Sequence, residues 1–352
     1  MKKIILATLA AAALVACAKE DVVVASKGET IAFDNAFVDN TTKAIDPSVK
    51  TLTLNHFVVY GTTTGNEDGA PEVCIFPGIA VAGAVSAVDA DGKATESSWT
   101  YLEAYTQYWI EGNDYHFAAV VNGKNDQPAT AAEETKATVL ADAVGMPETI
   151  SYNSANQRDL LYAEATAVGQ AKGSNAPVAF TFSHLLSKVK FTFNNTSAAD
   201  SNNGYTYKIT DIKIVNVGLN ATCNVTNYPN YTWAITDTTT AEFGNIVATG
   251  ETNEANTAAI DVLPGKSGSS LYERLVVPQA YTDLQVQCRI ALLYKGQEVD
   301  VENYNKTVSV TLECGHSYNF ILSGSVGDPI EFTVTKVNGW VEDNTQYTPN
   351  NN

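Results

Sequence analysis

The segment Leu284-Gln285-Val286-Gln287-Cys288-Arg289-Ile290-Ala291-Leu292 places an apolar side chain at every second position. Successive side chains of a β-strand point to opposite faces, so this pattern predicts a strand with one packed face and one solvated face. Antiparallel sheets that are covered on one side have this alternation. Cys288 lies in the apolar row, and we therefore expect its thiol to be buried and unpaired.

Similar segments recur along the chain and are separated by clusters of Gly, Asn, Asp and Pro. They are rich in β-branched and aromatic residues, which favour strands. The further segments are 51–60, 115–121, 178–182, 188–193, 207–217, 307–312 and 330–337. A chain of 352 residues, 45% of them hydrophobic, can fill two ordinary cores. The predicted fold class is all-β, with two antiparallel β-sandwich domains.

One stretch has a helical pattern instead. In residues 131–144, Val139, Leu140, Ala143 and Val144 form one apolar stripe behind an acidic first turn. We expect a minor surface helix there. The predicted domains are residues 44–185 and 186–340, and a flexible tail follows at 341–352, where apolar content is too low to pack.

The beginning of the chain resembles a bacterial lipoprotein signal. Two lysines precede a short apolar run, and Leu14-Val15-Ala16-Cys17 matches a lipobox. We expect a signal peptide at 1–16, a lipid on Cys17 and anchoring in the outer membrane. Lys19-Glu20-Asp21 resembles the signal that moves Bacteroidetes lipoproteins to the cell surface. The apolar run is too short to span a bilayer as a permanent helix.

Charge and cysteine usage exclude several classes of partner. The formal net charge of −18, without clustered Lys or Arg, argues against nucleic acid. After Cys17 the cysteines are Cys74, Cys223, Cys288 and Cys314, with no CxxC pair and no histidine at metal-ligand spacing. We therefore expect no metal and no cofactor. An even number of cysteines permits disulfides, but unpaired thiols are the favoured expectation.

The sequence also lacks a catalytic motif. Its histidines are scattered, and the adjacent Ser183 and His184 would point to opposite faces of a strand, so they cannot share a proton. A glycosidase needs a buried carboxylate, whereas Asp159 and Glu164 lie in polar or loop contexts and read as solvated surface. An enzyme is therefore disfavoured. One alternative is a monomeric surface lipoprotein that binds glycans through Trp99 or Trp109.

Several segments together resemble the fimbrillin (Mfa-like) family of Bacteroidales, whose members are subunits of type V pili. The resemblance rests on these segments in order: Trp99 with Tyr108-Trp109-Ile110-Glu111-Gly112-Asn113-Asp114-Tyr115-His116-Phe117-Ala118-Ala119, Arg158-Asp159-Leu160-Leu161-Tyr162-Ala163, Phe180-Thr181-Phe182-Ser183-His184-Leu185-Leu186-Ser187-Lys188-Val189, Val276-Val277-Pro278-Gln279, Gly315-His316-Ser317-Tyr318-Asn319-Phe320, and a last strand closing at Trp340. It implies two transthyretin-like sandwiches, location in surface fimbriae and a role in cell adhesion.

The resemblance also implies an assembly mechanism. A trypsin-like protease cuts the lipidated precursor behind its first strand, loss of that strand opens a groove, and a strand of the neighbouring subunit fills it. Mapped onto this chain, residues 17–43 are the propeptide, and Thr30-Ile31-Ala32-Phe33 is the removable strand with Ile31 and Phe33 on one face. The cut would fall between Lys43 and Ala44.

The implied donor strand contains Ile330, Phe332 and Val334 on one face; the alternative is an ordinary last strand of the second domain. The implied partners are other fimbrial subunits, in a homo- or hetero-polymer. Lys43 stands where arginine is common in the family, so an uncleaved anchor is a second alternative. Asp237-Thr238-Thr239 resembles a Bacteroidetes O-glycosylation site, with Thr238 as acceptor.

Overall fold

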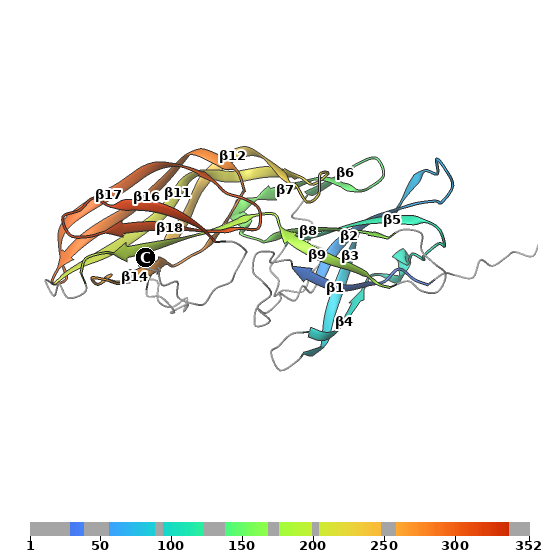
Figure 1. Cartoon of the computed structure of the whole chain (residues 1–352), viewed down its shortest axis with the longest axis horizontal. Helices are drawn as coiled ribbons and strands as arrows, with labels where there is room; N and C mark the ends of the chain where they lie inside the picture. Colours follow the sequence, from blue (N-terminus) through green and yellow to red (C-terminus); the bar gives the residue numbers. More distant parts are fainter. Residues whose placement is uncertain are drawn as a thin grey trace, which may run out of the picture.

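The computed structural model describes residues 29–38, 56–88, 94–122, 138–167, 176–198, 204–247 and 258–337. These residues are almost entirely in strands (Figure 1). The strands are β1 (Phe33–Val38), β2 (His56–Thr64), β3 (Glu72–Val88), β4 (Ala94–Thr100), β5 (Asp114–Asn122), β6 (Thr138–Ala141), β7 (Pro147–Asn153), β8 (Leu160–Ala167), β9 (Val178–His184), β10 (Ser187–Asn195), β11 (Tyr205–Asn224), β12 (Thr232–Gly244), β13 (Ile246–Val247), β14 (Ser267–Ser270), β15 (Arg274–Val276), β16 (Ala280–Tyr294), β17 (Gln297–Thr311), β18 (Ser317–Gly324) and β19 (Glu331–Val337). Two single-turn 3-10 helices, η1 (Glu103–Tyr105) and η2 (Ser154–Asn156), complete the described elements. In this part of the chain no helix is long and apolar enough to cross a membrane.

The first sheet has the order β1-β9-β8-β5-β2-β3-β4 and curls until β1 and β4 approach each other. Its strands pair antiparallel except for β1 and β9, which run parallel. Alternate residues of each strand face inward and form a core dominated by aromatic rings, among them Phe57, Phe76, Phe117 and Phe180. This curled sheet is the first sandwich.

The second sandwich packs two sheets face to face. One has the order β13-β14-β10-β18-β19, with β15 also paired to β10, and the other has the order β17-β16-β11-β7-β6, with β12 also paired to β11. Leu284, Val286, Cys288 and Ile290 of β16 are buried between them, which confirms the inward face that the alternation predicts. The all-β, mainly antiparallel fold class is thus confirmed.

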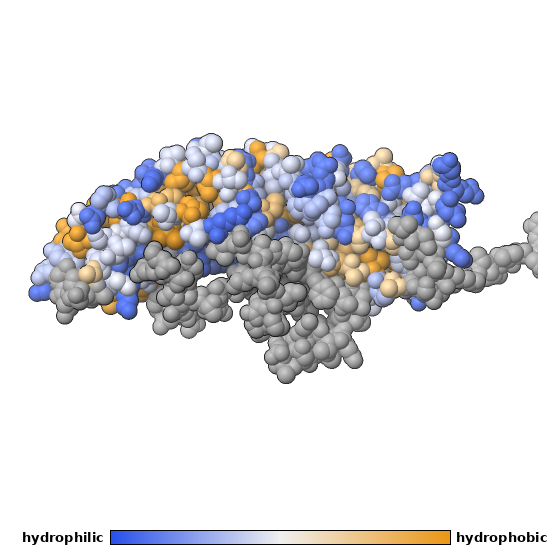
Figure 2. Space-filling view, in the orientation of Figure 1, coloured by the Kyte–Doolittle hydropathy of each residue, from blue (hydrophilic) through white to orange (hydrophobic). Residues whose placement is uncertain are grey.

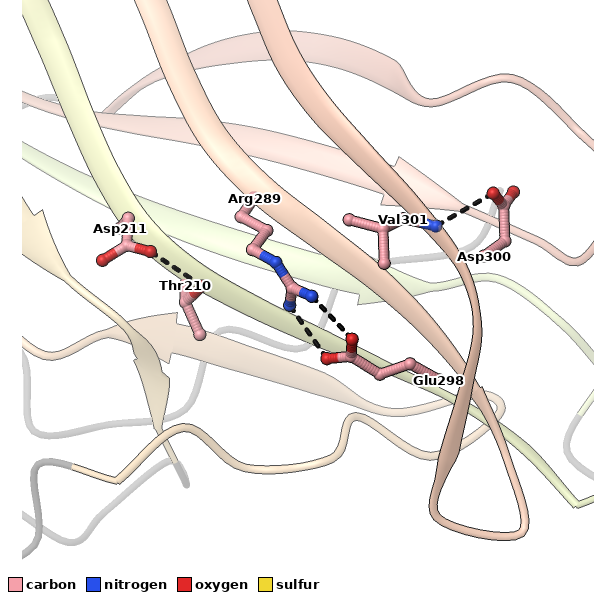
Figure 3. Close-up of polar contacts among 6 residues, drawn as sticks. All are labelled: Thr210, Asp211, Arg289, Glu298, Asp300 and Val301. Atoms are coloured by element: carbon pink, nitrogen blue, oxygen red, sulfur yellow. Dashed lines mark hydrogen bonds and ion pairs between the residues drawn. The ribbon is translucent and has the colours of Figure 1, made fainter.

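On the outer face of β16, Arg289 reaches across to Glu298 of β17. Its guanidinium donates two hydrogen bonds to the carboxylate, at 3.0 Å and 2.6 Å (Figure 3). Such a bidentate pair fixes the relative position of both side chains. The hydrogen bonds with Arg289 hold the pKa of Glu298 below its usual range.

A third hydrophobic cluster connects the two sandwiches. It combines Val120 and Tyr162 on the outer face of the first sheet with Ile150, Cys223 and other residues of β7 and β11. The chain passes directly from β9 to β10, yet the β6–β7 hairpin, which precedes this point in sequence, pairs with β11 of the second sandwich. The division into 44–185 and 186–340 stays a prediction.

The surface helix predicted over residues 131–144 is wrong for the part that the structure describes. Residues 138–141 form β6, and 142–146 form a turn. The Asp142 carboxylate accepts hydrogen bonds from the backbone N–H groups of Val144 and Met146, at 3.0 Å and 2.9 Å, and Gly145 adopts a φ of 92°. An Asp that caps its own turn, followed by a glycine at positive φ, favours a hairpin over a helix.

Candidate functional site

The first described segment, residues 29–33, lies in a slot of the first sheet and is hydrogen-bonded on both sides. On one side it contacts the backbone of residues 107–109, and on the other it reaches β9. The bonds run from Ile31 N to Gln107 O (2.9 Å), from Trp109 N to Glu29 O (2.9 Å), from Val178 N to Ala32 O (2.8 Å) and from Tyr101 Oη to Ile31 O (2.7 Å). β1 then continues along β9 as an edge strand.

The side chains of this segment complete the aromatic core. Ile31 is 1% exposed and Phe33 is 4% exposed. The Phe33 ring is within 6.2 Å, centroid to centroid, of the rings of Phe57, Phe76, Tyr101, Phe117 and Phe180. Removing the segment would therefore expose a groove lined by aromatic side chains and bordered by unpaired backbone groups.

The sequence predicts a strand at Thr30–Phe33 with Ile31 and Phe33 on one face. Both side chains do enter the same core, and Thr30 forms an isolated antiparallel bridge with Tyr108. The continuous strand, however, begins at Phe33 and pairs in parallel with β9.

The last described strand, β19, also lies at a sheet edge: among the described strands it pairs with β18 alone, and it ends its sheet. Ile330, Phe332 and Val334 face the core of the second sandwich but are only partly buried. Phe332 contacts Phe320 edge to face at 5.6 Å, and the Lys306 ammonium of β17 lies 5.7 Å from the centre of its ring. In this structure the segment is thus an edge strand with shallow anchors.

Two ionisable pairs lie near the junction of the sandwiches, and neither is the solvated surface that the sequence predicts. His184 Nδ1 lies 2.8 Å from an Asp159 carboxylate oxygen, and the His184 side chain is buried. Glu164 accepts hydrogen bonds from Tyr162 Oη at 2.7 Å and from His116 Nε2 at 3.0 Å. The correction has a simple cause: the pairing of β8 with β5 and with β9 brings these groups together, and no local pattern in the sequence predicts that pairing.

The chemistry of these pairs is that of structural contacts. The hydrogen bond with Glu164 raises the pKa of His116 against the opposing effect of burial, and burial raises the pKa of Tyr162. Ser183 precedes His184 on the same strand, β9, so it cannot share that histidine's proton. Among the described residues no group of His, Cys, Asp and Glu could hold a metal ion.

Of the two tryptophans considered for glycan contact, Trp109 is a core residue and Trp99 packs against the same core. Trp109 is 5% exposed and packs edge to face on Tyr115 at 4.7 Å. Trp99 packs on Phe57 at 5.1 Å, and its ring covers Gly83 so closely that a Cβ on that glycine would lie 2.6 Å away. The Trp109 ring is therefore not available as a sugar-stacking platform, whereas the Trp99 ring is only partly buried.

The remaining predicted residues fall into two groups. Cys74, Cys223, Cys288 and Cys314 are unpaired, and burial raises the pKa of Cys288 to about 12 and of Cys314 to about 11. Thr238 is exposed on β12, where its backbone N–H bonds the Asp237 carboxylate at 2.9 Å. Cys17, Lys43, Ala44 and the tail at 341–352 lie outside the described residues.

These features define a class of protein: a tandem β-sandwich whose first strand fills a deep groove and whose last strand lies on a sheet edge. A profile described as fimbrillin-like matches residues 40–340. The chain belongs to the fimbrillin-like family, and it is accordingly a structural protein and not an enzyme. No curated protein matches the chain.

One solved structure supports the fold, and two more are similar in sequence and coverage. A fimbrial protein from Bacteroides vulgatus is 17% identical, with a TM-score of 0.59, and the match covers 89% of this chain and 99% of that one. A protein from Bacteroides ovatus, described as one of cell adhesion, is 16% identical with a TM-score of 0.48 over 90% and 99% of the two chains. A similarly described protein from Bacteroides uniformis is 19% identical, with a TM-score of 0.45 over 88% and 98%.

Proposed function

We propose that this chain is a subunit of surface fimbriae that joins its neighbours by exchanging strands after proteolytic maturation, and so serves cell adhesion. The observation that carries the proposal is the placement of Phe33 in the centre of the first core on an edge strand. β1 pairs with β9 and not with β2, the next strand in sequence. A cut in the connection between β1 and β2 leaves β1 attached to the rest of the sandwich by non-covalent contacts alone.

The proposed cut lies between Lys43 and Ala44, in the connection from β1 to β2. Lys43 is the basic residue that a trypsin-like protease requires. Once β1 leaves, β9 and residues 107–109 offer unpaired backbone groups to an incoming strand, and the aromatic groove accepts alternate apolar side chains. This is strand addition at a sheet edge.

The proposed donor is the segment that carries Ile330, Phe332 and Val334. Its apolar residues recur at every second position, as Ile31 and Phe33 do in the strand that it would replace. Within its own sandwich it has one neighbouring strand and partly buried anchors, so leaving that position exposes less apolar surface than the groove would cover.

The test replaces both donor anchors. Phe332→Asp/Val334→Asp should remain a folded monomer by thermal melting but form no detergent-resistant ladder on unboiled gels, because charged side chains cannot enter an aromatic groove. Thr333→Asp is the matched control, since Thr333 is exposed on the opposite face of the same strand. Normal ladders from the double variant would show that the donor lies elsewhere, and misfolding would assign the strand to its own core.

Maturation is tested at the beginning of the chain. We propose export as an outer-membrane lipoprotein with lipid on Cys17, so Cys17→Ser should remove surface display. Protein sheared from cells should begin at Ala44, and Lys43→Ala should abolish that start. A sheared protein that still carries lipidated Cys17 would make the subunit an uncleaved anchor.

Thr238 is the proposed O-glycosylation site. It is exposed beside Asp237 on β12, which among the described strands pairs with β11 alone. Intact-mass measurement should show a glycan on the wild type that Thr238→Ala lacks. An unchanged mass would remove this proposal and leave fimbrial assembly unaffected.

A further inference from the structure

The last described strand is only partly covered by packing. Among the described strands β19 has β18 as its one neighbour. Its inward row contains the partly buried Ile330, Phe332 and Val334, and by the same alternation Lys336 follows on that face. Hydrophobic surface is visible on this sandwich in Figure 2, in the area where Figure 1 labels β16 and β18. Because apolar burial is incomplete, polar contacts take a larger share in holding the strand.

Lys336 connects the end of β19 to the loop before β18. Its ammonium lies 2.7 Å from a carboxylate oxygen of Glu313. The hydrogen bond with Lys336 holds the pKa of Glu313 below its usual range. Tyr318 stands directly across the sheet from Lys336, and its hydroxyl accepts a hydrogen bond from the Glu313 backbone N–H at 2.9 Å. Glu313 is thus fixed to β18 by its backbone and binds β19 by its side chain.

The loop that carries Glu313 is also fastened to the junction between the two sandwiches. Three hydrogen bonds join residues 313–316 to residues 186–188: Ser187 Oγ donates to Glu313 O (2.8 Å), Gly315 N to Leu186 O (2.8 Å) and Lys188 N to His316 O (3.0 Å). An exposed ion pair is weakened by the entropy that both side chains lose. Because the backbone of Glu313 is already fixed, this cost falls mainly on Lys336.

A second lysine contacts the strand at its aromatic anchor. The Lys306 ammonium lies 5.7 Å from the centre of the Phe332 ring, within the range of a cation–π contact. Lys306 belongs to β17, which ends the opposite sheet of the sandwich, so the contact joins two sheet edges. Charged side chains therefore hold β19 at two points, one at Phe332 and one at Lys336.

We propose that Glu313 and Lys306 are positioning residues that retain the donor strand on its own subunit until assembly. Loss of their contacts with the strand is then the first step of its release. The Lys336 and Glu313 side chains are 36% and 52% exposed, so salt screens their ion pair, which delays the departure of the strand without preventing it. The inference rests on the proposed function, because it takes this strand as the donor.

The main test variant is Glu313→Gln, which removes one charge and leaves the donor strand and the aromatic groove unchanged. Hydrogen exchange of the purified full chain, followed by mass spectrometry, should become about twofold to fivefold faster in residues 331–337. Lys306→Gln should have an effect of similar size, and the double variant should show about the product of the two effects. Wild type in about 1 M salt should approach Glu313→Gln.

The matched control is Glu148→Gln, which removes an exposed acid from β7, a strand that pairs with β6 and β11. Exchange in β19 should stay at the wild-type rate in this control. A general stabilising role of Glu313 would speed exchange in β10 and β18 as well, whereas retention of the strand confines the change to β19. Equal exchange in Glu313→Gln and Glu148→Gln, or faster exchange throughout the sandwich, would overturn the inference.

The consequence for assembly is measured separately. After cleavage, Glu313→Gln should form detergent-resistant ladders about twofold to fivefold faster than wild type. An unchanged time course would also overturn the inference. Failure of the proposed function has a different signature: normal ladders from Phe332→Asp/Val334→Asp would remove the donor assignment, and faster exchange of β19 in Glu313→Gln would then be the property of an ordinary last strand.

Discussion

The two terminal strands of the described chain use the same two-residue period but are buried to different depths. Ile31 and Phe33 are enclosed in the first core, whereas Ile330, Phe332 and Val334 are only partly buried at an edge of the second. Among the described strands, β1 pairs with β9 alone and β19 with β18 alone, but residues 29–32 ahead of β1 also bond the backbone of residues 107–109. The difference shows that the period determines which side chains face inward, while the residues packed around the strand determine how deeply those side chains are buried.

This difference in depth is the one expected of a subunit that loses its first strand and inserts its last strand into a neighbour. A deep groove binds its occupant strongly, and a shallow edge strand leaves its own sandwich at low cost. If both strands were deep, exchange would be unfavourable at the donor; if both were shallow, the joint would be weak. The predictions below test this difference in depth.

The largest effect is expected from truncation inside the first core. Phe33→Ala should destabilise the uncut chain by about 3–5 kcal/mol, because five aromatic neighbours lose their central partner. Phe332→Ala should cost about 1–2 kcal/mol, since its ring is only partly buried. Urea unfolding of both variants measures the difference. Equal losses would remove the distinction between deep and shallow strands.

A smaller effect is expected from the wall of the slot. Tyr101→Phe removes the hydroxyl that donates to Ile31 O at 2.7 Å, and the uncut chain should lose about 1 kcal/mol. In a chain that has been cut and has lost residues 29–33, the same substitution should leave the free energy of unfolding unchanged, because the acceptor Ile31 O is absent. Urea unfolding of wild type and variant, each before and after cleavage, gives the comparison. A loss that persists after removal of the segment would assign the hydroxyl a different role.

Parts of this arrangement follow from the sequence alone. The alternation in residues 284–292 predicts the buried row of β16, and the spacing of Ile31 and Phe33 predicts that both enter one core. The family resemblance directs attention to both terminal strands. Local period was sufficient here because each strand has one packed face.

Other parts depend on long-range pairing and could not be predicted. No local sequence pattern around Asp159 predicts its contact with the buried His184, and none around β7 predicts its pairing with β11. The helix predicted over residues 131–144 failed for a local reason instead. Asp142 and Gly145 form a turn signal that competes with the apolar stripe, and this turn signal is the stronger of the two.

The smallest effect concerns the outer face of the sheet that holds β1. The hydrogen bond with Glu164 raises the folded-state pKa of His116 above its ordinary 6.5, so protonated His116 stabilises the folded chain. This contribution is complete below about pH 6.5 and is lost as the pH rises through the folded-state pKa. Because the His116 side chain is 39% exposed, solvent screening should keep this contribution below about 1 kcal/mol.

Urea midpoints at about pH 5.5 and about pH 8.5 should differ slightly in the wild type, and this component should vanish in both His116→Gln and Glu164→Gln. Phe332→Ala should retain it, because β19 lies in the other sandwich. An unchanged pH dependence in His116→Gln would contradict the assignment.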